Sequence, residues 1–445
     1  MNRIIEYSFY ALFFLVPLIL TPWNYELFEF NKMLTVYVFT IIITAAWAIR
    51  MITTPLSGVR RTPFDIPILL FLASQILATV FSIDIRTSIL GYYSRFHGGL
   101  LSTISYIILY YAFVSNLIKR HVLLAIRSML LAAALVAFYA IAEHFGIDKN
   151  LWVQDVQSRV FSTLGQPNWL AAYLVTIMFI PIALLLNNSK LKVPIDFTQG
   201  KQTAKQQFKN QNILNFILLL LIFNFYFLTL LYTKSRSGLL GFALAYIIFW
   251  LALKVKPLKV FLLVTCLLLL VSFADGLRWI PQVAKYTSGV KSTNTPEVRP
   301  ATGSQLESGG SESGDIRKIV WKGALRIWRR YPLFGSGVET FAYSYYNFRP
   351  PEHNLVSEWD FLYNKAHNEY LNFFATTGIV GLGTYLLLQA WIFIWLFKHI
   401  SILNAAFLAG LVGLSVSNFF GFSTVSVALL FFLFPAFALT YETQT

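Results

Sequence analysis

The chain has 445 residues, of which 57% are hydrophobic and 12% charged, whereas soluble domains average roughly 45–50% apolar and about 25% charged residues. This composition excludes a water-soluble globular protein, because no fold of this length hides so much apolar surface from water. The formal net charge of +15 invites a nucleic-acid-binding interpretation, but the distribution of this charge among the loops indicates membrane orientation instead. A single cysteine, Cys266, excludes a disulfide framework and a cysteine-based metal site.

Apolar segments recur from one end of the chain to the other. A membrane-spanning helix needs about 20 predominantly apolar residues, and about twelve segments meet this criterion. They are residues 7–23, 33–51, 63–82, 100–117, 122–147, 168–186, 212–232, 237–253, 258–274, 370–397, 402–421 and 424–439. The first is expected to remain as a helix, since no small-x-small cleavage site follows it. The sequence therefore predicts an all-α polytopic membrane protein with about 12 transmembrane helices.

Lysine and arginine gather in alternate connecting loops. One set of loops holds Arg3, Arg50, Arg60, Arg61, Lys119, Arg120, Lys190, Lys192, Lys201, Lys205, Lys209, Lys254, Lys256, Lys259 and Lys398. The other set is poorer in basic residues, with Lys32, Arg86, Arg95, Lys149, Arg159, Lys234 and Arg236. Because cytoplasmic loops carry the excess of basic residues, both termini are expected in the cytoplasm and the long loop 275–369 outside.

The long loop separates transmembrane helices 1–9, in residues 1–274, from helices 10–12, in residues 370–445. Its first part, 287–314, is rich in Ser, Thr, Gly and Pro, a composition that predicts disorder. Ile316, Val320, Ala324 and Ile327 then recur at helical spacing. This pattern predicts a short amphipathic helix that ends before Pro332.

Two arginines at the expected external boundary are candidate ligands for an anion. Arg236 opens a span, where a charge near hydrocarbon is costly and needs a partner or a ligand; the alternative is a snorkelling interfacial side chain. Arg317 opens the amphipathic helix of the loop, and its guanidinium offers a planar donor fork that matches phosphate oxygens. The alternative for Arg317 is a solvated basic helix face.

Two further clusters lie in the same loop. Residues 332–337, with two glycines, predict a tight turn after the amphipathic helix. His367 begins the stretch His-Asn-Glu-Tyr just before the span 370–397. A histidine in this position can accept a proton at neutral pH, although a hydrogen-bonded structural histidine is the alternative.

The order of these clusters resembles that of the O-antigen ligase and O-antigen polymerase superfamily of membrane glycosyltransferases. The resemblance is carried by residues 233–238, Arg317, the 332–337 turn, residues 367–371, Gly378 and Gly381, with residues 159–161 and 165–168 upstream. It implies a glycosyltransferase C-like fold in which the external loop contains short helices. It also implies a glycan donor linked to undecaprenyl diphosphate, a glycan or lipid acceptor and an active site on the external face of the bacterial inner membrane.

The resemblance also implies roles for particular residues. His367 would take the proton from the acceptor hydroxyl, and Arg236 and Arg317 would stabilise the diphosphate, joined in donor binding by Arg159 and Asn168. Tyr345, Trp359 and Tyr363 would pack against sugars, or else form the core of the loop. No cofactor, metal or nucleic acid is expected, and the external loops contain no Asp-x-Asp motif.

Alternatives remain at two levels. The motifs do not separate an O-antigen ligase from a surface-polysaccharide polymerase or a protein O-oligosaccharyltransferase. A different class is a membrane transporter for a small anion, which would place its site near the membrane midplane. The spans contain few charged residues, such as Arg127 and Glu143, and the polar clusters lie at the outer boundary. This distribution favours the enzyme.

Overall fold

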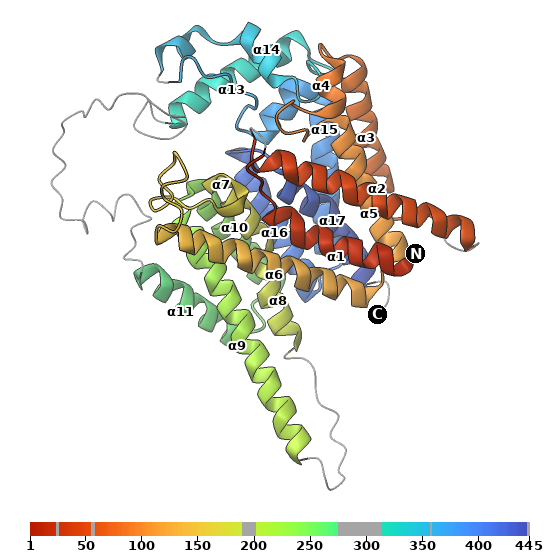
Figure 1. Ribbon diagram of the computed structural model, residues 1–445, viewed down its shortest axis with the longest axis vertical. Helices are drawn as coiled ribbons and strands as arrows, with labels where there is room; N and C mark the ends of the chain where they lie inside the picture. The colour runs from red at the N-terminus through yellow and green to blue at the C-terminus, as the bar shows by residue number, and fades with distance from the viewer. Residues whose placement is uncertain (24–25, 55–57, 189–201, 275–312, 357, 443–445) are drawn as a thin grey trace, which may run out of the picture.

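The computed structural model describes residues 1–23, 26–54, 58–188, 202–274, 313–356 and 358–442 (Figure 1). These ranges contain helices and no strands, which confirms the predicted all-α class. Seven of the described helices are long and apolar enough to cross a membrane, and further apolar helices have 10–17 residues. The chain is therefore a multi-pass membrane protein, while the number of spans stays a prediction. The disorder predicted for 287–314 falls almost wholly on residues outside the described ranges.

Every predicted span coincides with helix. Most ends differ by five residues or fewer, but α9 begins ten residues before the predicted span 212–232, and the predicted span 168–186 forms two helices, α7 and α8. The first part of the chain forms α1 (Asn2–Leu18), α2 (Glu29–Thr53), α3 (Asp65–Val80), α4 (Ile85–Leu90), α5 (Leu100–Asn116), α6 (Lys119–His144), η1 (Ser162–Leu164), α7 (Pro167–Ile177), α8 (Phe179–Asn188), α9 (Gln202–Tyr232), α10 (Arg236–Ala252) and α11 (Leu258–Ala274). The second part forms α13 (Ser313–Arg330), α14 (Phe341–Phe348), η2 (Pro351–Leu355), α15 (Glu369–Lys398), α16 (Ile402–Phe419) and α17 (Val425–Glu442).

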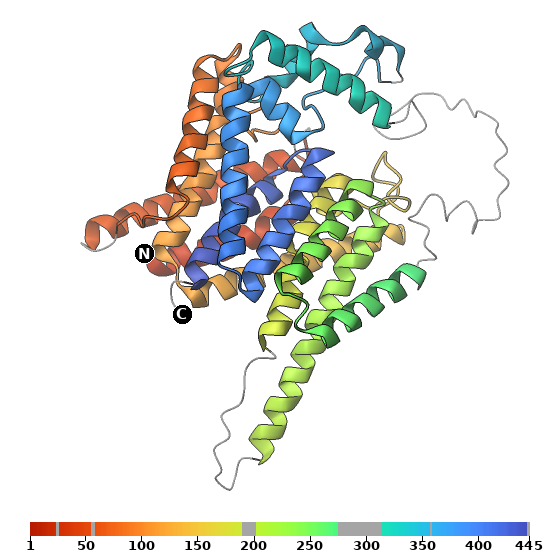
Figure 2. The same ribbon diagram turned by 180° about the vertical axis from the view of Figure 1, so that it is seen from behind.

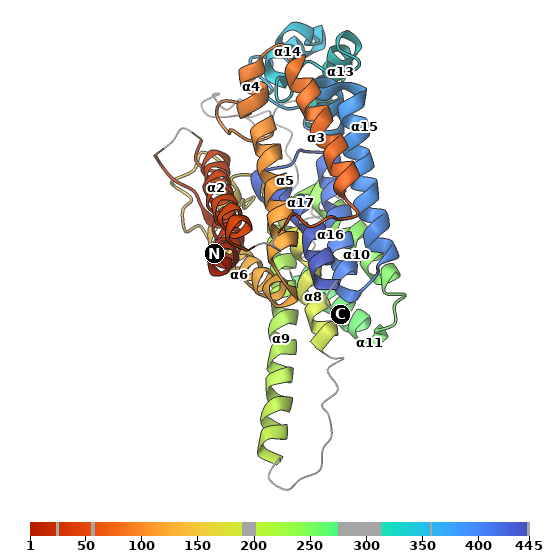
Figure 3. The same ribbon diagram turned by 90° about the vertical axis from the view of Figure 1, so that its right-hand side faces the viewer.

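The helices run in two main directions. α3, α5 and α15 stand side by side, whereas α1, α2 and α6 cross the molecule at a steep angle to them (Figures 1 and 3). α17 lies between these groups, and its residues are buried from Val425 to Thr440. α17 is apolar all round, which suits a helix that is shielded from water on every side.

Residues 313–356 and 358–368, called the external segment after the location that the sequence predicts for them, form a small layer over one end of the bundle, where α13 and α14 cover the start of α15 (Figure 2). The predicted amphipathic helix is present as α13. Its apolar stripe is buried in a cluster made of Ile316, Val320, Ala324, Ile327, Phe341, Tyr345, Tyr363, Ala366 and Ala375. The apolar stripe thereby anchors the external segment to the first turns of α15.

α15 is interrupted at Gly378, whose φ of 66° and ψ of −166° are not helical. An interruption leaves backbone donors and acceptors without helical partners, which is costly inside a membrane protein. The 332–337 turn supplies these partners through four hydrogen bonds: Ile379 N to Pro332 O (2.9 Å), Val380 N to Leu333 O (3.2 Å), Ser336 N to Ala375 O (3.1 Å) and Gly337 N to Thr376 O (2.9 Å). The turn and the break therefore form one unit, which fixes the residues after the turn against α15.

Candidate active site

His367 lies immediately before α15, and the local sequence explains its position. Asn368 is the N-cap residue of α15, and its side-chain oxygen accepts a hydrogen bond from Leu371 N at 3.0 Å. His367 has a left-handed φ of 51°, which turns the chain into the helix. Its ring packs edge-on against the rings of Tyr363 and Phe422, with both centroid distances at 5.5 Å.

Two arginines from distant parts of the chain act on His367. Arg317 is brought there by α13, where Trp321 lies one turn further along and donates to the carbonyl oxygen of Ala366 at 3.1 Å. Arg95 comes from the segment between α4 and α5. The tertiary fold thus brings two guanidinium charges close enough to one imidazole to act on it electrostatically.

The surroundings of His367 keep its imidazole neutral. Burial, followed by the positive charges of Arg317 and Arg95, lowers the pKa of His367 to about 3. Burial and the charges of Lys365 and Arg95 also hold the pKa of His97 well below its usual range. At physiological pH both rings are therefore neutral, and each has a nitrogen lone pair that can accept a hydrogen bond.

Arg95 is held over two aromatic rings. Its guanidinium carbon lies 5.0 Å from the centroid of Trp169 and 5.5 Å from that of Phe422, and these two rings contact each other edge-on at 5.8 Å. Such an arrangement gives a cation–π attraction and restricts the guanidinium to one place. Arg95, Trp169, Phe422 and His367 therefore form a continuous cluster.

The other predicted donor-binding residues meet at the starts of α7 and α10. The Ser235 hydroxyl donates to the side-chain oxygen of Asn168 at 2.7 Å, and Arg159 Nε donates to the carbonyl oxygen of Thr233 at 3.1 Å. Arg236 is the first residue of α10 and has an exposed side chain. Trp169, which follows Asn168, carries Arg95 on its face, so this group adjoins the His367 cluster.

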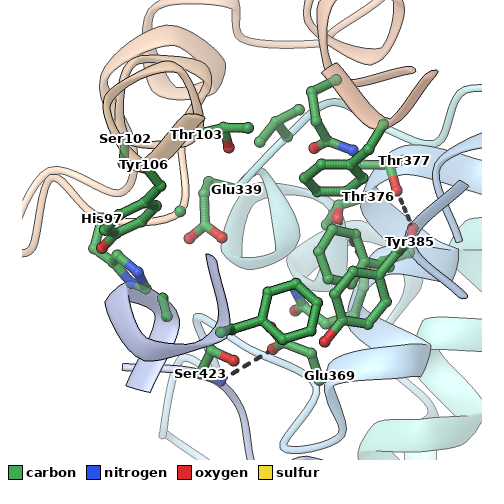
Figure 4. A pocket seen from close by; sticks show the side chains of 18 of the residues that line it. His97, Ser102, Thr103, Tyr106, Glu339, Glu369, Thr376, Thr377, Tyr385 and Ser423 are labelled. Carbon is green, nitrogen blue, oxygen red and sulfur yellow. Dashed lines mark hydrogen bonds between the residues drawn. The ribbon is translucent and has the colours of Figure 1, made fainter. Parts of the chain in front are cut away.

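A cavity of about 700 Å³, part of it open to solvent, has Ser423 in its lining, the residue that follows Phe422 (Figure 4). Its walls come from α3, the start of α5, α15 and α17, together with Val338, Glu339 and Lys365. Lys365 and Glu339 form a buried ion pair, and each side chain is less than a tenth exposed. The Lys365 ammonium also lies 5.7 Å from the Phe422 ring, which links the cavity to the His367 cluster.

The three aromatic residues predicted to bind sugars have different surroundings. Tyr345 and Tyr363 are buried, and the Tyr345 hydroxyl is 2.7 Å from Nδ1 of His353 within the core of the external segment. Trp359 has a 58% exposed side chain. Burial favours the core alternative for both tyrosines, because their faces contact other protein rings.

Sequence reasoning did not select Arg95, Trp169, Phe422, Glu339 or Lys365. Arg95 stood out only as one basic residue in a short loop rich in aromatic residues, and the sequence did not show which segments it would meet. Among the described residues, no group of three or more His, Cys, Asp or Glu side chains is arranged to hold a metal ion.

Residues 217–386 match the family model described as O-antigen ligase. The predicted resemblance to that superfamily is confirmed. The O-antigen ligase match contains Arg236, Arg317 and His367, whereas Arg95, Arg159 and Asn168 lie before it. No match to a curated protein is found. The O-antigen ligase match indicates membrane glycosyltransferase activity of that kind.

Proposed function

We propose that this protein transfers a glycan from an undecaprenyl-diphosphate donor to an acceptor hydroxyl, as an O-antigen ligase-like enzyme that needs no metal ion. The observation that carries this proposal is that Arg95 and Arg317 both lie close enough to His367, just before α15, for their charges to act on its imidazole. A diphosphate leaving group needs fixed positive charge, and a hydroxyl nucleophile needs a proton acceptor. This cluster provides both, and two of its residues, Arg317 and His367, lie within the O-antigen ligase match.

The residues suggest a sequence of events. The acceptor oxygen attacks the anomeric carbon of the donor, and its proton passes to the neutral imidazole of His367. The bond between the anomeric carbon and the diphosphate oxygen breaks, and the leaving diphosphate carries its electron pair away. Arg317 and Arg95 stabilise the charge that develops, with Arg236 and Arg159 at the adjoining helix starts completing the donor site.

Donor binding would itself activate the base. In the donor-free protein the two guanidinium charges oppose protonation of His367. A diphosphate bound between them offsets their charge, and the basicity of the imidazole rises as the donor arrives. The proton acceptor would thus gain strength only in the complex that is ready to react.

The proposal is tested with the full-length protein in nanodiscs, supplied with undecaprenyl-diphosphate-linked glycan, a membrane extract containing acceptors and excess EDTA. Transfer of labelled glycan is expected to continue in EDTA and to fall strongly in an Arg317→Gln variant. Loss of transfer on chelation with recovery on adding Mg²⁺ would overturn the metal-independent mechanism. Accumulation of a small anion in proteoliposomes, with no transfer, would favour the transporter.

A further inference from the structure

The cavity beside the His367 cluster contains a carboxylate that the proposed donor chemistry does not use. Glu339 has a left-handed φ of 61° and a side chain that is 5% exposed. It is placed by Gly98, where a Cβ atom would lie only 2.3 Å from Glu339 Oε1. A non-glycine residue in this conformation is strained, and such strain gathers where a side chain must be held in one place.

The two oxygens of this carboxylate differ in their surroundings. One accepts a hydrogen bond from the ammonium of Lys365. The other, Oε2, is buried and makes no hydrogen bond with any described residue. Leaving a buried acceptor without a donor costs about 1–3 kcal/mol, more for a charged group. Figure 4 shows the carboxylate pointing into the cavity, where a ligand can supply the missing donor.

The charge of the cavity indicates what kind of ligand it accepts. Glu339 and Glu369 both line it, with Lys365 as the one ammonium group among its walls as described. The lining therefore offers a diphosphate no excess of positive charge, whereas the arginines of the neighbouring cluster attract it. Hydroxyl donors suit the carboxylates, and further polar side chains of Gln75, Ser102, Thr103, Asn372, Thr376 and Thr377 also line the cavity.

The apolar part of the lining also suits a sugar. Phe71, Tyr106, Phe373, Tyr385, Phe431 and Phe432 line the cavity with aromatic rings, and within this wall Tyr106 stacks on Phe432 and Phe373 stacks on Tyr385. Aromatic faces cover the C–H faces of a pyranose, while convergent polar groups fix its hydroxyls. We propose that this cavity binds a sugar ring of the acceptor, with a hydroxyl donating to Oε2 of Glu339. The assignment rests on the proposed transferase function, to which it adds the site of the acceptor saccharide.

Saccharide binding tests this assignment directly. Full-length protein in nanodiscs is titrated with methyl β-D-glucopyranoside and methyl N-acetyl-β-D-glucosaminide, and binding is followed by saturation-transfer NMR. The wild type is expected to bind at least one of them, and Glu339→Gln to bind it at least about tenfold more weakly, since a hydrogen bond to a charged group is lost. The matched control is Glu352→Gln, which changes an exposed carboxylate of the external segment and is expected to bind as the wild type does.

A second variant covers the case in which Glu339→Gln does not fold. Ala428→Phe adds bulk to the cavity wall on α17 and leaves the ion pair intact, so it is expected to abolish saccharide binding. Failure of the wild type to bind either glycoside overturns the inference. Undiminished binding by Ala428→Phe, or by a folded Glu339→Gln, also overturns it.

A parallel titration with undecaprenyl diphosphate separates this inference from the proposed function. Arg317→Gln is expected to lose affinity for undecaprenyl diphosphate and to keep saccharide binding, whereas Glu339→Gln is expected to show the reverse. If Glu339→Gln weakens saccharide binding while Arg317→Gln leaves undecaprenyl diphosphate binding unchanged, the proposed donor site is wrong and the proposed sugar site is supported. If Arg317→Gln weakens undecaprenyl diphosphate binding while Glu339→Gln leaves saccharide binding unchanged, only the proposed sugar site is wrong.

Discussion

The carbonyl oxygen of Leu333 occupies the space that a side chain on Gly378 would need, since a Cβ atom there would lie 2.3 Å from it. On the other side of the contact, a Cβ on Gly335 would lie 2.1 Å from the carbonyl carbon of Thr376. The turn and the helix break therefore fit together only because both positions are glycine. Glu339, which follows the turn, and His367, which lies just before the same helix, owe their relative positions to this contact.

Gly378→Ala is expected to destabilise the protein by at least about 1–3 kcal/mol, because its φ and ψ are strained for any other residue and the added methyl group meets Leu333. The measurement is the thermal unfolding midpoint in detergent. Gly383→Ala is the control in the same helix, since its Cβ would meet nothing within 4 Å, and it is expected to be neutral or stabilising. Equal effects of the two substitutions would contradict the role given to the break.

His367→Asn is expected to reduce glycan transfer by about 10²–10⁴-fold, the usual contribution of a general base. Asparagine tolerates the left-handed backbone of this position better than alanine, so stability is expected to be preserved. His399→Ala, at the opposite end of α15 and exposed, serves as control. A His367→Asn protein that retains most of its turnover would assign a structural role to the histidine. Lost donor binding with unchanged stability would place it at the diphosphate.

The pH dependence of His367 follows from its lowered pKa. A pKa of about 3 means that the donor-free protein keeps this imidazole neutral as pH falls from 7 to 5. As the pH is lowered, kcat/KM is therefore not expected to fall near pH 6.5. Arg317→Gln removes one positive charge and is expected to raise the pKa of His367 toward its ordinary value. NMR titration of histidine-labelled protein measures both values, and an unperturbed wild-type titration would contradict the prediction.

Arg95→Lys is expected to lower transfer by about 10–100-fold, because an ammonium lacks the planar fork that stacks on Trp169 and Phe422. The neighbouring substitution Arg86→Lys, at an exposed position in α4, is expected to leave transfer unchanged. Full activity of Arg95→Lys would show that positive charge alone matters at this place.

The predicted topology is tested by cysteine labelling in a Cys266→Ser background. Leu355→Cys, at an exposed position of the external segment, is expected to react with a membrane-impermeant maleimide in intact cells. Lys256→Cys, in the loop between α10 and α11, is expected to react only after permeabilisation. Reversed labelling would place the candidate active site in the cytoplasm and exclude a donor presented outside.

The sequence by itself determined the helices, because a chain in a bilayer must satisfy its backbone hydrogen bonds within each apolar segment. This constraint is local, so apolar runs located most helices to within five residues, although the start of α9 lies ten residues earlier because its first turns are polar. Residues 258–274 coincide with α11, and the apolar stripe beginning at Ile316 located α13. The sequence also located the motif around His367, because this motif consists of neighbouring residues at a helix start.

Only the tertiary structure decided which polar groups meet. Arg95 joins His367, and Gly98 admits the side chain of Glu339, across separations of more than 200 residues that no local pattern encodes. The same holds for the 332–337 turn, whose glycines predict a tight turn but not its hydrogen bonds to the break of α15. These contacts depend on how helices pack, and packing is set by the shapes of many side chains together rather than by any one segment.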